Sequence, residues 1–376
     1  MNTGQAGGRS IDTGQAGGRS LVSVIFDCDT GIDDSLALLY LLAHDDVELA
    51  AIVSTAGNVP ADVVCANNLG WLTLLDRHDV EVCLGAAGPL ECALMTTEDT
   101  HGPLGIGYAE LPSPTLAQSR RSAADAWIEL TAARPGELVG LVTGPMTNLA
   151  LAIRADPALP ARLRRLVIMG GAFHHPGNTT PTSEWNVAVD PEAAQEVFAA
   201  FGRNGAPAPI ICPLDLTEQI VMTPDHLGRL AAASDSSPVE QPSPADERGL
   251  RSVATNAVIR PLVDAVRFYF EFHADHDEGY IAHMHDPFAA AVAVNPALVQ
   301  TRSARVDVET GGRMSRGTTI SDDRGHWGLE PNAQIAISTD VDIFFDDLID
   351  RIAALARLSA VRDPLPEQPF PRPERE

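Results

Sequence analysis

The chain has 376 residues, of which 45% are hydrophobic, and this is enough for one large α/β domain. Its formal net charge is −25, so its surface repels phosphate backbones and nucleic acid is excluded as a partner. The sequence contains no lysine, which excludes Schiff-base catalysis and a P-loop lysine.

Cysteine usage and hydropathy indicate the cellular setting. The five cysteines are an odd number without CxxC spacing, which predicts neither a disulfide framework nor a zinc site. No apolar run reaches the ~18 residues of a membrane span. The N-terminus also lacks a charged segment followed by an apolar one, as in signal peptides. We therefore expect a cytoplasmic protein without membrane contacts.

The two ends of the chain differ from its middle. Residues 1–20 repeat TGQAGGRS, which cannot bury a core and predicts a flexible tail. A single domain is expected over residues 21–360, followed by a polar tail at 361–376. Inside the domain, residues 231–249 are rich in Ser, Pro and Asp and predict a surface loop.

Apolar runs with a strand-like pattern alternate with helical patterns. The predicted strands are Val22–Phe26, Val47–Ser54, Val80–Leu84, Leu138–Thr143, Leu166–Met169 and Pro209–Pro213. The predicted helices are Ser35–Ala43, Ala61–Asp76, Ala123–Ala133, Thr147–Arg154, Pro191–Phe201 and Asp342–Leu358. This alternation predicts an α/β fold with a mostly parallel open sheet and helices on both faces. Residues 302–340 carry alternating strand-like patterns, which predict a small antiparallel edge of the sheet.

The strongest local signal is VIFDCDTGIDD, Val24–Asp34, where an apolar strand turns into a helix. It places four carboxylates within eight residues at the carboxyl end of a strand, where ligands bind in open α/β sheets. Four like charges are costly there unless a cation offsets them. Carboxylates with a backbone carbonyl suit Ca²⁺ better than Mg²⁺. Helix capping is the simpler explanation, but it would use only one or two of the aspartates.

An apolar strand that ends in DxDxT also opens the haloacid-dehalogenase-like phosphatases. In this chain Thr30 follows Asp29 directly, without the spacer of that motif. Such a phosphatase would also need a later basic clamp and a GDxxxD segment, and no lysine or GDxxxD occurs. The phosphatase is therefore the weaker alternative.

Further polar segments lie where a ribose-binding hydrolase would need them. Thr55–Asn58 and Thr143–Asn148 each follow a predicted strand, and Asn178 with Glu184–Asn186 occupies the loop after a third. His285–Pro287 opens an apolar helix. Because carboxyl ends of parallel strands share one edge, these segments are expected to converge on Asp27–Asp34.

These motifs resemble those of the inosine–uridine-type nucleoside hydrolases. The resemblance rests on DCDTGIDD, TAGN, TGPMTNLALA, MGGAF, EWNVAVDPEAA and HMHDP, in that family's order, over roughly Val22–Asp340. The family usually has Pro where Thr30 stands and Phe where Trp185 stands, and neither position supplies a metal ligand. The resemblance implies hydrolysis of the N-glycosidic bond of ribonucleosides to ribose and free base by a calcium-activated water.

The same resemblance implies roles for individual residues. The implied calcium ligands are Asp29, Asp34, the carbonyl of Thr143, and Asp286. The implied ribose-binding residues are Asp33 and Asn58, with Asn178, Glu184 and Asn186 at the 3′ and 5′ hydroxyls. The implied catalytic groups are Asp29 as general base and His285 beside the leaving base. A homodimer or homotetramer is also implied.

Simpler roles stay open for several of these residues. Asn58 could be a turn residue, and Glu184 and Asn186 could cap a loop. His285 could only pack the start of its helix; if it acts as an acid, a carboxylate neighbour should raise its pKa. A non-catalytic, calcium-dependent ribose-binding protein is a further alternative.

Other histidines have no assignable role from sequence. His101 lies in a Gly-rich segment that could be a substrate lid or a plain surface loop. The histidines at 174, 175, 273, 276 and 283 could suggest zinc, but their spacing matches no established motif.

Overall fold

The computed structural model describes residues 21–362, so the predicted tail at 1–20 and residues 363–376 lie outside the described residues. A nine-stranded sheet has the order β10-β9-β11-β6-β5-β4-β1-β2-β3. Its strands are β1 (Val22–Cys28), β2 (Val47–Ser54), β3 (Val82–Leu84), β4 (Leu138–Val142), β5 (Arg165–Met169), β6 (Ile210–Cys212), β9 (Val299–Val308), β10 (Thr319–Asp322) and β11 (Ala333–Thr339). The short strands β7 (Val221–Met222) and β8 (Ala282–His283) form a separate antiparallel pair.

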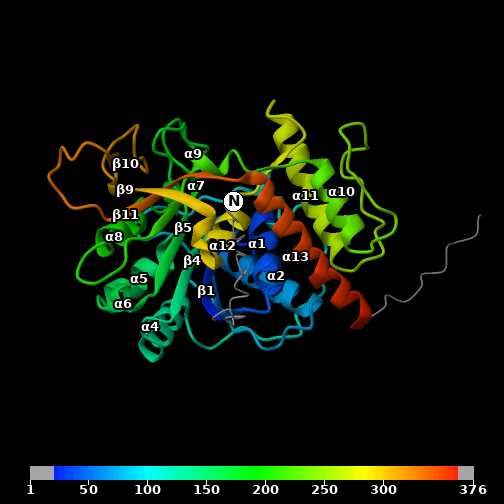
Figure 1. The fold of residues 1–376 in the computed structure, drawn as a ribbon, viewed down its shortest axis with the longest axis horizontal. Coiled ribbons are helices and arrows are strands. Elements are labelled where there is room, and N and C mark those ends of the chain that lie inside the picture. The colour runs from blue at the N-terminus through cyan, green and yellow to red at the C-terminus, as the bar shows by residue number, and fades with distance from the viewer. Residues whose placement is uncertain (1–20, 363–376) are drawn as a thin grey trace, which may run out of the picture.

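Two groups of helices cover the two faces of the sheet (Figure 1). One group comprises α1 (Ile32–Leu42), α2 (Ala61–Leu74), α10 (Pro224–Ala233), α11 (Ile259–Asp275), α12 (His285–Val294) and α13 (Val341–Arg362). The other comprises α4 (Ala123–Ala133), α5 (Thr147–Ala155), α6 (Leu159–Arg162), α7 (Trp185–Val189) and α8 (Pro191–Ala200). The short helices α3 (Glu98–His101) and α9 (Leu214–Thr217) lie in connections.

The sheet has the predicted architecture. β1 to β6 pair in parallel, and β11 joins them in parallel to β6. β9 pairs antiparallel with both β10 and β11, which confirms the antiparallel edge. Several element boundaries differ from the predicted ones: α1 begins at Ile32 and not at Ser35, α10 continues to Ala233, and α13 continues to Arg362. The loop predicted from residue 231 therefore begins at 234, and residues 361 and 362, predicted to belong to the polar tail, lie in α13. Within residues 21–362, no helix is long and apolar enough to cross a membrane.

Strand β1 carries alternating side chains to the two faces. Phe26 packs in the core beneath α1 and α12, whereas Ile25 packs beneath α4. Asp27 accepts hydrogen bonds from the Trp127 Nε1 (2.9 Å) and the Asn148 Nδ2 (3.2 Å). Burial raises the pKa of Asp27 to about 6. Asp27 therefore ties β1 to α4 and α5, and it is not part of the predicted metal cluster.

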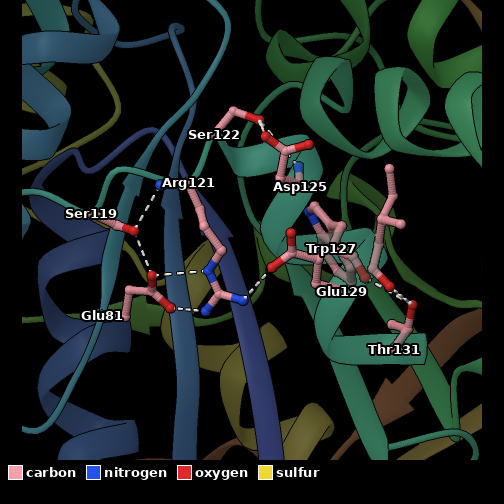
Figure 2. Close-up of polar contacts among 9 residues, drawn as sticks. Glu81, Ser119, Arg121, Ser122, Asp125, Trp127, Glu129 and Thr131 are labelled. Atoms are coloured by element: carbon pink, nitrogen blue, oxygen red, sulfur yellow. Dashed lines mark hydrogen bonds and ion pairs between the residues drawn. The ribbon is translucent and has the colours of Figure 1, made fainter. Parts of the chain in front are cut away.

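The start of α4 is held by a polar cluster (Figure 2). Ser122 caps the helix by accepting from the backbone N–H of Asp125 at 3.1 Å. Arg121 pairs with Glu81, just before β3, and its Nη1 lies 3.1 Å from Glu129 on α4 (Figure 2). This cluster anchors α4 against the edge strand β3.

Candidate active site

A cavity of about 640 Å³ opens at the carboxyl edge of the parallel strands. The pairing of Asp27 with Val142 and of Cys28 with Ser54 brings the loops after β1, β2 and β4 side by side. All the site residues predicted from sequence line this cavity except Asp34, which lies buried behind it. The convergence expected from the strand ends is therefore found, and α12 joins it from outside the sheet.

Three aspartates cluster at the bottom of the cavity, where Asp33 and Asp286 line it and Asp34 lies behind them. Oxygens of Asp33, Asp34 and Asp286 all lie within 4.8 Å of one another, and all three residues are buried. Asp33 and Asp34 are in the first turn of α1, and Asp286 is in the first turn of α12. Because α1 packs against α12, the positive ends of two helix dipoles meet at these carboxylates.

Hydrogen bonds fix the positions of the carboxylates. Asp34 accepts from the backbone N–H of Gly31 at 2.8 Å and from the Thr143 hydroxyl at 2.6 Å. Asp29 accepts from the backbone N–H of Asn58 at 2.8 Å. The carbonyl of Thr143, a predicted ligand, accepts from the Asn186 Nδ2 at 2.7 Å and retains a second lone pair.

The electrostatics of this cluster fit a bound cation. Burial, and then the charge of Asp34, raise the pKa of Asp29 well above its usual value and that of Asp33 to about 7. Burial also raises the pKa of Asp34, and burial with the neighbouring aspartates raises that of Asp286. Within the described part of the chain, no arginine pairs with these groups. The all-oxygen donor set can hold a metal ion of the hard class.

One wall of the cavity is formed by the segment around α7. Glu184 caps α7: its oxygens accept from the backbone N–H groups of Asn186 and Gly171, each at 2.8 Å. The simpler capping role considered for Glu184 is therefore present, and the residue still lines the cavity. Asn178 accepts from the backbone N–H of Trp185 at 2.9 Å. The indole Nε1 of Trp185 is buried without a hydrogen-bond partner among the described residues.

His285 is half-buried and neutral. Its Nδ1 lies 2.8 Å from the Thr217 hydroxyl. Burial, reinforced by the nearby His283 and His273, holds the pKa of His285 well below its usual value. The expectation that a carboxylate neighbour raises this pKa is therefore wrong, because desolvation of the imidazole dominates.

His101 also lies in the cavity wall and does not belong to a plain surface loop. It is buried at the end of α3, where its Nδ1 accepts from the backbone N–H of Ile32 at 3.1 Å. Burial lowers its pKa to about 3, so the ring is neutral and its proton is on Nε2. Its ring lies 5.4 Å from that of Tyr269.

Sequence reasoning missed the wall supplied by α11. The cavity residues on this helix are Tyr269, Phe272 and His273, and His276 follows at its C-cap. The last three follow Tyr269 by three, four and seven positions, which is the spacing of one helix face, and this pattern was visible in the sequence. Glu218, Glu278 and His283 carried no such signal because they lie on short, separate segments.

The fold is α/β, and the buried carboxylates at its strand ends could hold a metal ion. The comparisons with known proteins identify the family of enzymes to which the chain belongs. The model of the family described as "Inosine-uridine preferring nucleoside hydrolase" matches residues 24–346. A pyrimidine-specific ribonucleoside hydrolase RihA of Citrobacter koseri is 34% identical over 334 residues, covering 89% of this chain and 98% of its own. The RihA of Escherichia coli O8 is 35% identical over 331 residues, covering 88% and 97%.

Solved structures give the same result. A purine-preferring ribonucleoside hydrolase from Gardnerella vaginalis superposes with a TM-score of 0.77 at 30% identity, covering 89% of this chain and 99% of its own. The chain belongs to the inosine-uridine preferring nucleoside hydrolase family. It is a hydrolase that cleaves the N-glycosidic bond of ribonucleosides, and the phosphatase and non-catalytic alternatives are not favoured.

The close approach at Gly57 gives a test of how tightly Asp29 must be held. A Cβ at Gly57 would lie 2.2 Å from the Asp29 Oδ2, so Gly57→Ala must displace that carboxylate. We expect kcat/KM for nucleoside hydrolysis to fall by at least ~10²-fold, as for a misplacement of about 1 Å. Gly88→Ala is the matched control, because its Cβ would meet Leu94 at an ordinary 3.7 Å. Activity of Gly57→Ala within twofold of the control would contradict this role of Asp29.

Proposed function

We propose that this enzyme uses one calcium ion, held by Asp29, Asp34, the carbonyl of Thr143 and Asp286. The observation that carries the proposal is the buried cluster of Asp33, Asp34 and Asp286, with Asp29 beside it and no arginine paired with it among residues 21–362. Calcium fits better than Mg²⁺ because it takes 6–8 oxygens in flexible geometry, including carbonyls. Bound there, a cation would lower the pKa of a water and engage the ribose hydroxyls.

Asp29 is the proposed general base. It lines the cavity, where its carboxylate could accept a proton from the attacking water. The backbone N–H of Asn58 holds one of its oxygens. The bond from ribose to the base then breaks through an oxocarbenium-like state, as in other glycoside cleavages.

Ribose recognition is assigned to the surrounding polar side chains. Asp33 and Asn58 are proposed to bind the 2′ and 3′ hydroxyls, because both are buried and line the cavity beside Asp29. Asn178, Glu184 and Asn186 are proposed to serve the 3′ and 5′ hydroxyl region from the opposite wall.

We assign His285 the role of assisting the departure of the base. The Thr217 hydroxyl lies 2.8 Å from the His285 Nδ1, and we assign it as the donor, which leaves the ring proton on Nε2. Because the ring is neutral, it donates a hydrogen bond from Nε2 to the negative charge that develops on the base. Transfer of a proton to the base requires the imidazolium form, which that negative charge favours.

The remaining proposals concern the setting of the enzyme. A cytoplasmic location is supported by the five free cysteines, four of them buried. A homodimer or homotetramer is proposed from the family resemblance alone. Light scattering of the purified protein tests the assembly.

The substrate class is tested by release of free ribose from a panel containing inosine, uridine and 2′-deoxyinosine. The panel holds both base classes because relatives are named for pyrimidine or for purine preference. We expect ribose and free base in equal amounts, and ~10⁴-fold lower kcat/KM without the 2′ hydroxyl, whose partners would stay unpaired. Equal values for inosine and 2′-deoxyinosine would refute the ribose assignment.

The metal is tested by exhaustive chelation and by Asp34→Asn, which keeps the side-chain shape but removes one charge. Both should abolish turnover, and Asp34→Asn should also lose bound calcium, measured by elemental analysis. Asp346→Asn is the surface control, since Asp346 pairs only with Arg229 among the described residues. Calcium should restore the chelated enzyme better than Mg²⁺. Full activity in metal-free protein would overturn the proposal.

The role of His285 is tested with two leaving groups. A nitrophenyl riboside loses a stable anion and needs no proton, whereas the base of inosine does. We expect His285→Ala to lose ~10²–10⁴-fold on inosine but to retain activity on the nitrophenyl riboside. His78→Ala, at an exposed histidine paired with Asp76, is the control. Equal losses on both substrates would indicate a purely structural His285, and no loss would remove it from the mechanism.

A further inference from the structure

A second group of potential metal ligands lies in the same cavity. His273, Glu278 and His283 each offer one ligand atom, and the three atoms lie within 4.8 Å of one another. His273 is in the last turn of α11, Glu278 is in the turn after it, and His283 ends β8. All three residues line the cavity. None of them belongs to the aspartate cluster or to the residues assigned above.

The ring of His273 is oriented as in metal-bound histidines. Its Nδ1 lies 2.8 Å from the carbonyl oxygen of Tyr269, which can only accept, so Nδ1 carries the proton. The Nε2 therefore has a free lone pair. A histidine that donates its other ring N–H to a backbone carbonyl has the fixed tautomer typical of a metal ligand.

The contact of His273 with Glu278 leaves room for an ion. The His273 Nε2 lies 3.7 Å from the Glu278 Oε2, which is too far for a hydrogen bond. Two ligand atoms of a tetrahedral site with bonds of about 2.0–2.1 Å lie ~3.3 Å apart. The Glu278 side chain is 53% exposed, so it can close the remaining gap.

His283 supplies the independent observation. Its Nδ1 is buried and makes no well-formed hydrogen bond among residues 21–362, although the backbone of Glu218 lies close to the ring. Its ring centre lies 5.0 Å from that of His273. A buried ring nitrogen without a well-formed hydrogen bond is costly, and an ion bound by His283 would offset part of that cost.

We propose that His273, Glu278 and His283 form a second metal site, which binds a late first-row divalent cation of the Zn²⁺ type. Two imidazoles and one carboxylate with an open fourth position are a known zinc ligand set. Imidazole favours such ions, whereas the all-oxygen aspartate cluster favours calcium, so the two sites select different metals. The proposed zinc site shares the cavity with His285 and Asp286, and it therefore faces a bound substrate.

The test is direct metal binding by the full-length, tag-free protein in saturating calcium. Titration with Co²⁺ should give one equivalent with the visible absorption of a four- or five-coordinate site, and Zn²⁺ should abolish that absorption. We expect Glu278→Gln, His273→Gln and His283→Gln each to weaken binding by at least ~100-fold, since even the loss of outer partners costs ~10–100-fold.

Two variants serve as controls. His276→Gln changes a histidine on the same end of α11 that is outside the ligand group, and it should leave cobalt binding unchanged. Asp34→Asn should lose calcium but keep the cobalt signal. Glu278→Gln lies in an exposed turn and keeps the test valid if a histidine variant fails to fold.

Two results would overturn the proposal: absence of one-equivalent binding, or binding that survives Glu278→Gln and His283→Gln. The measurement needs no substrate, so its failure would leave the nucleoside hydrolase assignment untouched.

Discussion

The central constraint of this structure is the burial of like charges. Asp29, Asp33, Asp34 and Asp286 are withdrawn from water at one edge of the sheet, where desolvation and mutual repulsion raise the pKa of each. Such a group of carboxylates is stable when it is protonated or when it binds a cation. The surrounding architecture serves to hold these four side chains together.

Two helices and three loops provide that support. The N-termini of α1 and α12 meet at the cluster, which offsets part of the negative charge. Backbone N–H groups of Gly31 and Asn58 and the Thr143 hydroxyl fix individual oxygens. The glycine at 57 keeps the second loop close enough to Asp29 for this bonding. Rigid placement of this kind is what an enzyme needs to orient a water and a sugar.

The histidines around the cavity differ in chemistry from the aspartates. Burial lowers the pKa of His101, His273 and His285, so these imidazoles are neutral, in contrast to the acidic cluster. His101 and His285 lie beside the aspartates, since His101 accepts from the backbone N–H of Ile32 and His285 precedes Asp286. Neutral imidazoles can donate a hydrogen bond or bind a metal ion of the Zn²⁺ type, whereas carboxylates suit a hard cation.

The sequence alone determined much of the fold and the position of the aspartate site. The alternation of strands and helices predicted the parallel sheet, and the segment Val24–Asp34 predicted the site, because both are local patterns with fixed periodicity. Tertiary structure decided what depends on distant neighbours. In the tertiary structure Asp27 bonds to Trp127 and lies away from the other aspartates. The pattern of β1 does not reveal this, because it does not specify which helix covers each face of the sheet. The tertiary structure made His285 neutral, since burial outweighs a carboxylate close in sequence. It also brought Glu278 and His283 to His273, which no spacing along the chain revealed, because only packing of α11 against β8 creates that contact.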